Sequence, residues 1–167
     1  MYSVGVRDHI MVAHSLKGEV FGPAQRLHGA TYTVCAELER EELDEHGIVI
    51  DIAVFRGTLR SVLRELDYQN LDEHPAFAER CSTSENIARH VHRELGRRLP
   101  VMAGTLLAVT LEESPVAWAR YRAPVRGVTI VAEEDPDTTQ DTAQGADAMA
   151  SLDKPARKSR RGRRSEP

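Results

Sequence analysis

The sequence predicts an α+β fold, a four-stranded antiparallel sheet with two helices on one face, in the element order ββααββ. Period-two alternation of apolar residues towards both ends of the core predicts strands, and apolar residues three and four apart between them predict helices. Strands that follow one another in pairs favour antiparallel pairing over a doubly wound sheet. The other face of such a sheet needs a cover, so we expect the chain to form homo-oligomers.

The first pair of strands is predicted over residues 3–14 and 28–43. Apolar residues recur at every second position, at Val4, Val6, Ile10 and Val12 in the first strand and at Tyr32, Val34, Ala36 and Leu38 in the second. A short loop that contains Gly18, Gly22 and Pro23 joins the two stretches, which therefore read as a hairpin.

Two amphipathic helices are predicted in the middle of the chain. Asp51 is a good N-cap for the first, over residues 52–66, whose apolar stripe has helical spacing at Phe55, Leu59, Val62, Leu63 and Leu66. Thr83 or Ser84 caps the second helix, over residues 85–98. The polar stretch between the helices is expected to be a loop.

Pro100 ends the second helix, and the second pair of strands is predicted over residues 101–111 and 117–131. A turn at residues 112–115 joins them, which completes the ββααββ order.

The composition is that of a soluble globular protein, with 41% hydrophobic and 29% charged residues in a chain of 167. No apolar stretch approaches the ~20 residues of a membrane span, and the first residues lack the pattern of a signal peptide. We therefore expect a cytoplasmic protein without a membrane partner. Cys35 and Cys81 stand in no paired motif and are expected to be free thiols. The net charge of −4 argues against nucleic-acid binding by the chain as a whole.

The length suits one domain, residues 1–132, followed by a tail, residues 133–167. The tail is acidic and polar as far as Asp153 and basic over residues 154–164. Such a composition buries too little apolar surface to offset the entropy of ordering, so we expect disorder. The alternative is weak, salt-sensitive contact of the basic cluster with RNA or another polyanion.

His14 and His28 are the most informative residues of the chain. The predicted hairpin can bring their imidazoles together, and neutral imidazole is a preferred zinc ligand. The pair is therefore a candidate metal site, with a purely structural role as the alternative. Strict alternation places His9 on the face opposite to His14, and it places Ala30 on the same face as His28, opposite to Cys35.

Five motifs occur in one order along the chain. They are a split histidine motif (Ala13-His14, then Ala24-Gln25-Arg26-Leu27-His28-Gly29-Ala30), GIVIDIAVFRGTL at 47–59, LDYQNLDE at 66–73, STSENIA at 82–88 and LEES at 111–114, with Tyr121 downstream. Together they resemble the 6-pyruvoyl-tetrahydropterin synthase family, which includes the queuosine-pathway 6-carboxytetrahydropterin synthases. The resemblance covers about residues 1–130.

The resemblance implies a tunnelling fold (T-fold), in which α+β subunits join their sheets into a barrel, commonly stack into hexamers and hold active sites between subunits. It also implies a zinc-assisted carbon-oxygen or carbon-carbon lyase that acts on dihydroneopterin triphosphate or a related pterin. His14 and His28 match two of the three zinc ligands, and Ala30 replaces the third. Ala24 replaces the cysteine that serves as the base.

The remaining roles also follow from the resemblance. Asp67 matches the acid of a proton relay whose histidine is replaced here by Tyr68. Glu113 matches the glutamate that anchors the pterin, because a carboxylate can accept two parallel hydrogen bonds from its guanidine-like edge. Thr83 and Glu85 match further substrate-binding positions.

Three functions remain open from the sequence. The first is an active pterin lyase with a rearranged site. The second is a catalytically altered or inactive member that binds a pterin or purine-like ligand through Glu113. The third is a scaffold or assembly protein whose basic tail recruits a partner. The residues lost at positions 24 and 30 favour the second, whereas the surviving binding residues favour a working pocket.

Overall fold

The computed structural model describes residues 1–102 and 104–125. These form, in chain order, β1 (Tyr2–His14), η1 (Glu19–Gln25), β2 (His28–Arg40), α1 (Ile52–Leu63), β3 (Gln69–Asn70), η2 (Pro75–Phe77), α2 (Ser84–Arg98), β4 (Leu106–Ser114) and β5 (Ala117–Pro124). The predicted tail lies outside the described residues. Among the helices of the described part, none is long and apolar enough to cross a membrane.

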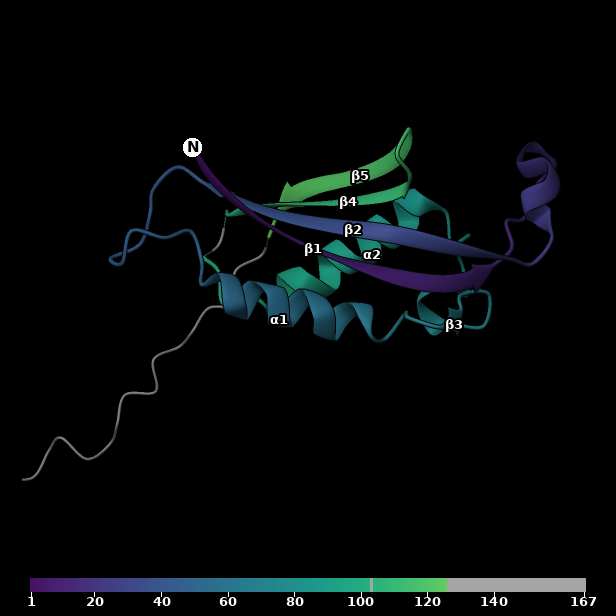
Figure 1. The fold of residues 1–167 in the computed structure, drawn as a ribbon, viewed down its shortest axis with the longest axis horizontal. Coiled ribbons are helices and arrows are strands. Elements are labelled where there is room, and N and C mark those ends of the chain that lie inside the picture. The colour runs from purple at the N-terminus through teal and green to yellow at the C-terminus, as the bar shows by residue number, and fades with distance from the viewer. Residues whose placement is uncertain (103, 126–167) are drawn as a thin grey trace, which may run out of the picture. The chain divides into compact units, whose positions relative to one another are not determined.

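The α+β architecture is confirmed, with α1 and α2 on one face of a twisted sheet (Figure 1). The prediction of four antiparallel strands is wrong in one respect, because the sheet has five strands in the order β3-β1-β2-β4-β5 and is mixed. The short strand β3 runs parallel to Val12 and Ala13 of β1. Backbone bonds flank it, from the Tyr68 amide to the Met11 carbonyl and from the Leu71 amide to the Ala13 carbonyl. Two residues leave no alternation to detect in a sequence.

Several element boundaries also differ from the prediction. β4 ends at Ser114 rather than at residue 111, and β5 ends at Pro124, whereas residues 126–131 of the predicted last strand lie outside the described residues. The first helix ends at Leu63 rather than at residue 66, although Leu66 remains fully buried. β2 ends at Arg40 rather than at residue 43. β4 begins at Leu106 rather than at residue 101, because Gly104, with a φ of 86°, lies in a turn that the Thr105 amide closes on the Met102 carbonyl.

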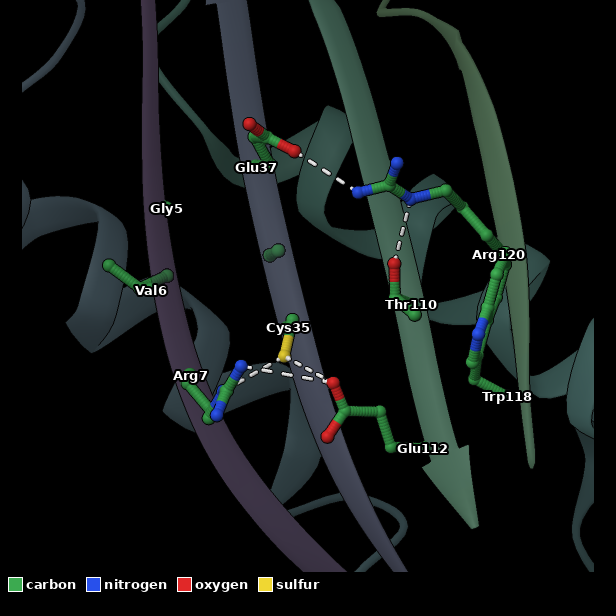
Figure 2. A pocket seen from close by; sticks show the side chains of 10 residues that line it. Gly5, Val6, Arg7, Cys35, Glu37, Thr110, Glu112, Trp118 and Arg120 are labelled. Carbon is green, nitrogen blue, oxygen red and sulfur yellow. Dashed lines mark hydrogen bonds and ion pairs between the residues drawn. The ribbon is translucent and has the colours of Figure 1, made fainter. Parts of the chain in front are cut away.

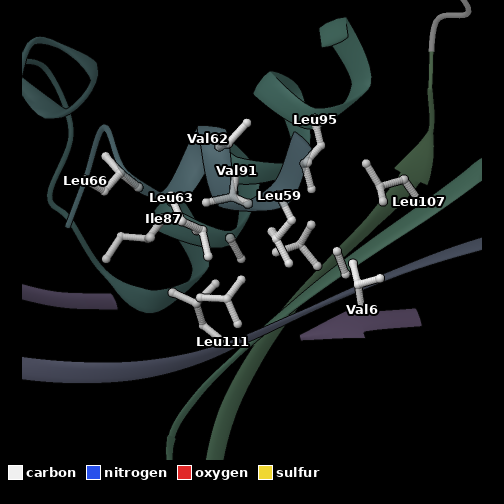
Figure 3. Packing of buried hydrophobic residues seen from close by; sticks show 14 of the residues in the cluster. Val6, Leu59, Val62, Leu63, Leu66, Ile87, Val91, Leu95, Leu107 and Leu111 are labelled. Carbon is white, nitrogen blue, oxygen red and sulfur yellow. The ribbon is translucent and has the colours of Figure 1, made fainter. Parts of the chain in front are cut away.

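The helices and the inner face of the sheet enclose one apolar core (Figure 3). The inward positions of the sheet are those that the alternation predicts, and both helices bury the predicted stripes. The fully buried side chains include Ile10, Tyr32, Val34, Leu38, Phe55, Leu59, Val62, Ile87, Val91, Leu95, Leu107 and Leu111. Burial of each large aliphatic or aromatic side chain contributes about 1.5–3 kcal/mol, so this packing is the main source of the sheet–helix association.

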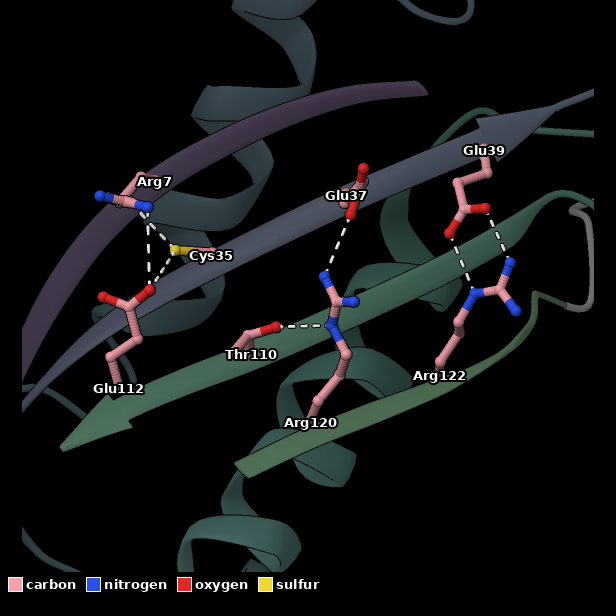
Figure 4. A network of polar contacts seen from close by, with 8 residues as sticks. All are labelled: Arg7, Cys35, Glu37, Glu39, Thr110, Glu112, Arg120 and Arg122. Atoms are coloured by element: carbon pink, nitrogen blue, oxygen red, sulfur yellow. Dashed lines mark hydrogen bonds and ion pairs between the residues drawn. The ribbon is translucent and has the colours of Figure 1, made fainter. Parts of the chain in front are cut away.

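The opposite, outer face of the sheet is polar. Three arginine–glutamate pairs cross its strands, Arg7–Glu112 at 3.8 Å, Arg120–Glu37 at 3.1 Å and Arg122–Glu39 at 2.7 Å (Figure 4). Such exposed pairs contribute only about 0–1 kcal/mol each, so they add little to stability. These pairs instead restrict which surfaces can pack on this face, because a covering surface has to offer partners to charged groups.

His92 is a titratable group inside the core, 6% exposed on α2. Its Nε2–H donates to the Ala123 carbonyl of β5 at 3.1 Å, and its ring meets Tyr121 edge to face at a centroid distance of 4.8 Å. The Nδ1 atom has no hydrogen-bond partner among the described residues. Burial lowers the pKa of His92 below its ordinary 6.5, against an opposing effect of the carbonyl bonds.

Burial also lowers the pKa values of His14 and His90, so acid should destabilise the fold. Between the lowered folded pKa values and 6.5, the unfolded chain binds more protons than the folded one. The contribution of these histidines to the free energy of unfolding is then complete above pH 6.5. It falls as the pH drops, by up to about 1.4 kcal/mol per pH unit for each histidine. Urea denaturation from pH 8 to pH 5 measures this slope.

His92→Gln keeps an N–H donor but cannot titrate, so its slope below pH 6.5 should be shallower than that of the wild type. His46→Gln, in an exposed loop, is the matched control and should keep the wild-type slope. An unchanged slope for His92→Gln would show that His92 does not contribute to the acid sensitivity.

Candidate functional site

The β1–β2 register brings the two predicted metal-binding histidines together. His14 and His28 are directly opposite each other at the end of the hairpin, so their side chains project from the same face. Their ring centroids are 4.6 Å apart and the rings are tilted by 48°. The prediction that the hairpin brings the two imidazoles together is confirmed.

Hydrogen bonds to carbonyl groups hold both rings in one tautomer. The Nδ1 of His14 lies 2.9 Å from the Ser82 carbonyl, and the Nδ1 of His28 lies 2.8 Å from the Arg26 carbonyl. A carbonyl can only accept, so both Nδ1 atoms carry the proton and a neutral ring leaves its lone pair on Nε2. Metal-binding histidines commonly show this arrangement, in which the non-ligating nitrogen donates to a backbone carbonyl.

Burial keeps His14 neutral. His14 is 2% exposed, and its desolvation lowers its pKa below 6.5 against the opposing effect of the Ser82 carbonyl. The neighbouring His28 lowers it further, since two imidazolium charges at this distance repel each other. At neutral pH His14 therefore presents a lone pair rather than a positive charge.

A pocket of about 250 Å³ opens beside this pair. It is lined by His14, Leu16, Phe21, Ala24, His28, Tyr32, Thr83, Ser84, Glu85, Glu113, Ala117, Trp118 and Ala119. Five of the seven predicted site residues are thus brought together from four separate parts of the chain. Ala24, at the position of the missing cysteine, also lines the pocket.

Glu113 reaches the pocket from β4. Odd-numbered residues of β4 face the helices, as the pairings of Leu111 with Val34 and of Val109 with Ala36 show. Glu113 follows on the same face, at an irregularity of the β4–β5 pairing between Glu112 and Ser114. Its neighbour Glu112 belongs to the outer face.

The N-terminus of α2 forms another wall of the pocket. The Thr83 hydroxyl accepts a hydrogen bond from the Asn86 amide at 3.4 Å and so caps the helix, as predicted. Thr83, Ser84 and Glu85 line the pocket from this first turn, where the helix dipole and free amides favour negative groups.

Sequence reasoning missed several residues of the site, among them Phe21, Tyr32, Ser82 and Trp118. Phe21 and Trp118 add aromatic surface to the pocket, and Ser82 holds His14 through its carbonyl and hydroxyl oxygens. Tyr32 meets His14 edge to face and receives the Ser84 hydroxyl bond at 3.5 Å; burial raises the pKa of its own hydroxyl. Their apolar or small polar character gave them no signal beyond that of ordinary core or loop residues.

Asp67 and Tyr68 do not line this pocket in a single chain. The Asp67 carboxylate accepts the Met11 amide of β1 at 2.9 Å, and the Tyr68 amide donates to the Met11 carbonyl at 2.7 Å. Tyr68 is 74% exposed and has a φ of 57°, a left-handed conformation that is uncommon for a bulky residue. Their role as a proton relay stays a prediction, one that requires a second copy of the chain.

The residues present do not complete a zinc site of the expected kind. His14 and His28 supply two lone pairs with suitable outer hydrogen bonds, but the part of the chain that the structure describes holds no group of three potential ligands. Ala30 lies on the His28 face, two residues further along β2, where a third imidazole would be expected. Catalytic zinc sites use three protein ligands, so the described residues provide an incomplete set.

A larger hollow, of about 560 Å³, lies on the outer face of the sheet (Figure 2). Arg7 donates to the Cys35 sulfur at 3.0 Å on its floor, and Arg120 bridges Thr110 and Glu37. None of the predicted site residues lines it. Cys35 therefore lies on the face opposite to the histidine pair, as the alternation predicts.

Comparisons with known proteins agree with this geometry. A family model described as "6-pyruvoyl tetrahydropterin synthase" matches residues 3–124. The 6-carboxy-5,6,7,8-tetrahydropterin synthase of Bacillus subtilis is 28% identical over 125 residues, which are 71% of this chain and 83% of that protein. The human 6-pyruvoyl tetrahydrobiopterin synthase is 33% identical over 89 residues, which are 52% of this chain and 60% of that protein.

Solved structures show the same similarity. The 6-pyruvoyl tetrahydropterin synthase of Caenorhabditis elegans superposes with a TM-score of 0.63 at 27% identity, covering 73% of this chain and 95% of that one. The Plasmodium falciparum enzyme of the same name, at 16% identity and a TM-score of 0.62, supports the fold.

Placing a third imidazole at position 30 tests the hypothesis that His14 and His28 are two ligands of an incomplete zinc site. Ala30→His should raise the zinc affinity by more than about tenfold over the wild type, because even the outer partners of zinc ligands are worth that much. Competition with a chromogenic chelator measures the affinity, and elemental analysis should approach one zinc per chain. The control, Ala30→His with His14→Ala, should lose the gain. Tight zinc in the wild type would show that a third ligand comes from elsewhere.

Proposed function

This chain belongs to the 6-pyruvoyl tetrahydropterin synthase family, and we propose that it binds a pterin in the pocket between His14 and Glu113. The ligand class is dihydroneopterin triphosphate or a related pterin that carries a polar side chain. Binding is the part of the family's function for which the pocket retains most groups.

The placement of Glu113 carries this proposal. The carboxylate lines the pocket on the same face of the sheet as the histidine pair, where it can accept two parallel hydrogen bonds from the amino and ring N–H groups of a pterin. Phe21 and Trp118 offer aromatic faces to the flat ring system. The ring would then extend its side chain towards His14 and His28.

The second candidate function is a lyase step on that side chain. It is favoured by the pairing of His14 with His28, because the Nδ1 of each ring donates to a backbone carbonyl and leaves Nε2 as the atom that can accept a proton or bind a metal ion. Zinc, if bound there, would polarise the oxygens of the side chain. Ala24 and Ala30 argue against a lyase step, because they replace the cysteine that serves as the base and the third histidine of the family's zinc site.

We also propose that copies of the chain assemble through their sheet edges, in a homo-oligomer such as a hexamer. Residues 2–10 of β1 and the whole of β5 form the two outer edges of the sheet, since the segment around β3 bonds the β1 backbone from Met11 onwards. Unpaired strand edges favour pairing with another chain. Such an assembly would allow Asp67 and Tyr68, at the β1 edge, to approach the pocket of a neighbouring subunit.

Glu113→Ala should weaken the binding of neopterin by about 100-fold or more, because two charge-assisted hydrogen bonds are lost at about 1.5–3 kcal/mol each. Isothermal titration calorimetry measures the affinity. Glu112→Ala removes the adjacent carboxylate from the other face and should bind as the wild type does; circular dichroism checks that both variants are folded. Equal affinity in the Glu113 variant and the wild type would rule out this anchor.

Turnover distinguishes binding from catalysis. With dihydroneopterin triphosphate, the wild type should release triphosphate at least about 100-fold more slowly than the double variant Ala24→Cys/Ala30→His, since a positioned base contributes about 10²–10⁴-fold. Chromatography of the pterin products and an assay of free triphosphate follow the reaction. A wild type as fast as the double variant would make the lyase, rather than binding alone, the function of the chain.

A further inference from the structure

α2 lines a second cavity, which shares no lining residue with the pocket at Glu113. This cavity has a volume of about 330 Å³ and lies between α2 and residues 75–80, which comprise η2 and the three residues after it. Three arginines line it, Arg80 after η2 and Arg89 and Arg93 on α2. Arg89 and Arg93 are four residues apart, so they share one face of the helix.

None of these three guanidinium groups pairs with a carboxylate within residues 1–102 and 104–125. Other arginines of the same helix are paired, since Arg97 contacts Glu94 and Arg98 contacts both Glu94 and Glu65. The outer face of the sheet follows the same pattern of paired arginines. The cavity therefore gathers three guanidinium groups that carry no carboxylate partner among the described residues.

The other lining residues do not cancel this charge. Glu79 contributes a single carboxylate, and it lies beyond ion-pair distance of the three arginines. The His90 imidazole adds a polar ring packed against Phe77, at a centroid distance of 5.5 Å. Asn86 donates to the Cys81 carbonyl at 2.8 Å and so joins α2 to the segment that bears Arg80.

Three guanidinium groups around one cavity suit a tetrahedral oxyanion. Each guanidinium presents a planar fork of donors that matches phosphate geometry. A carboxylate has only two oxygens, whereas a terminal phosphoryl group presents three, one for each arginine. Half-buried Arg89 lies in a partly desolvated setting in which such charge-assisted bonds are stronger than in water.

We propose that Arg80, Arg89 and Arg93 form a binding site for a phosphoryl group, supplied by inorganic pyrophosphate or phosphate or by a small phosphorylated metabolite. The site is separate from the pterin pocket and does not depend on the function proposed for it.

Calorimetry of the full chain with inorganic pyrophosphate, and separately with ADP, tests the site in phosphate-free buffer of low ionic strength. The wild type should bind pyrophosphate at one site, and Arg89→Ala/Arg93→Ala should bind at least about tenfold more weakly. Arg80→Ala, outside the helix, should also lose affinity. Arg56→Ala/Arg60→Ala, on exposed positions of α1, removes the same charge with the same change in helix propensity and should keep the wild-type affinity.

Tighter binding of ADP than of pyrophosphate would identify the ligand as a phosphorylated metabolite, and the reverse order would identify an inorganic anion; both support the site. An absence of pyrophosphate binding to the wild type would overturn it. So would equal losses in the α1 and α2 variants, which indicate a general charge effect. Wild-type affinity in Arg89→Ala/Arg93→Ala would also overturn it, since that variant keeps the basic residues 154–164.

Discussion

The antiparallel register between β1 and β2 is the constraint on which both the core and the site depend. It pairs Ile10 with Tyr32 and Val6 with Ala36, so the inward side chains of the two longest strands meet the helices together. A slip by one residue would move every one of these side chains to the outer face. The same register ends by placing His14 opposite His28, so the candidate site is a continuation of the core pattern to the end of the hairpin.

The outer face shows the other half of this constraint. Its arginine–glutamate pairs, such as Arg122 with Glu39, occupy the alternate positions of the strands that form the core. The sheet is therefore apolar on the helix side and ionic on the other, which fits a lining wetted by solvent or a charged partner better than a second hydrophobic layer. Glu112 and Glu113 illustrate the division, because adjacent residues of one strand serve two different surfaces.

Most of the fold was predictable because period-two and helical patterns act over many residues and each violation would bury a charge or expose a core side chain. The two-residue strand β3 was not, since its pairing rests on backbone groups that carry no side-chain signal. In the site, residue types with distinctive chemistry, such as His14, His28 and Glu113, were predictable through motif spacing. Phe21, Tyr32 and Trp118 were not, because an aromatic residue at a pocket wall looks in sequence like one in the core. The separation of Asp67 from the pocket was hidden as well, since sequence motifs state order along the chain and not distance in space.

The two histidines differ in what their surroundings explain. His14 is buried, and its bond to the Ser82 carbonyl ties the end of β1 to the residues before α2, so packing and hydrogen bonding alone account for it. His28 is only partly buried, and its Nδ1 bonds within its own segment, to the Arg26 carbonyl two residues earlier. A structural role therefore explains His14 without explaining His28. Since the register is held by apolar pairs further along the strands, the fold does not need an imidazole at position 28. Ligand binding at this end of the hairpin therefore explains the presence of His28 better than it explains that of His14.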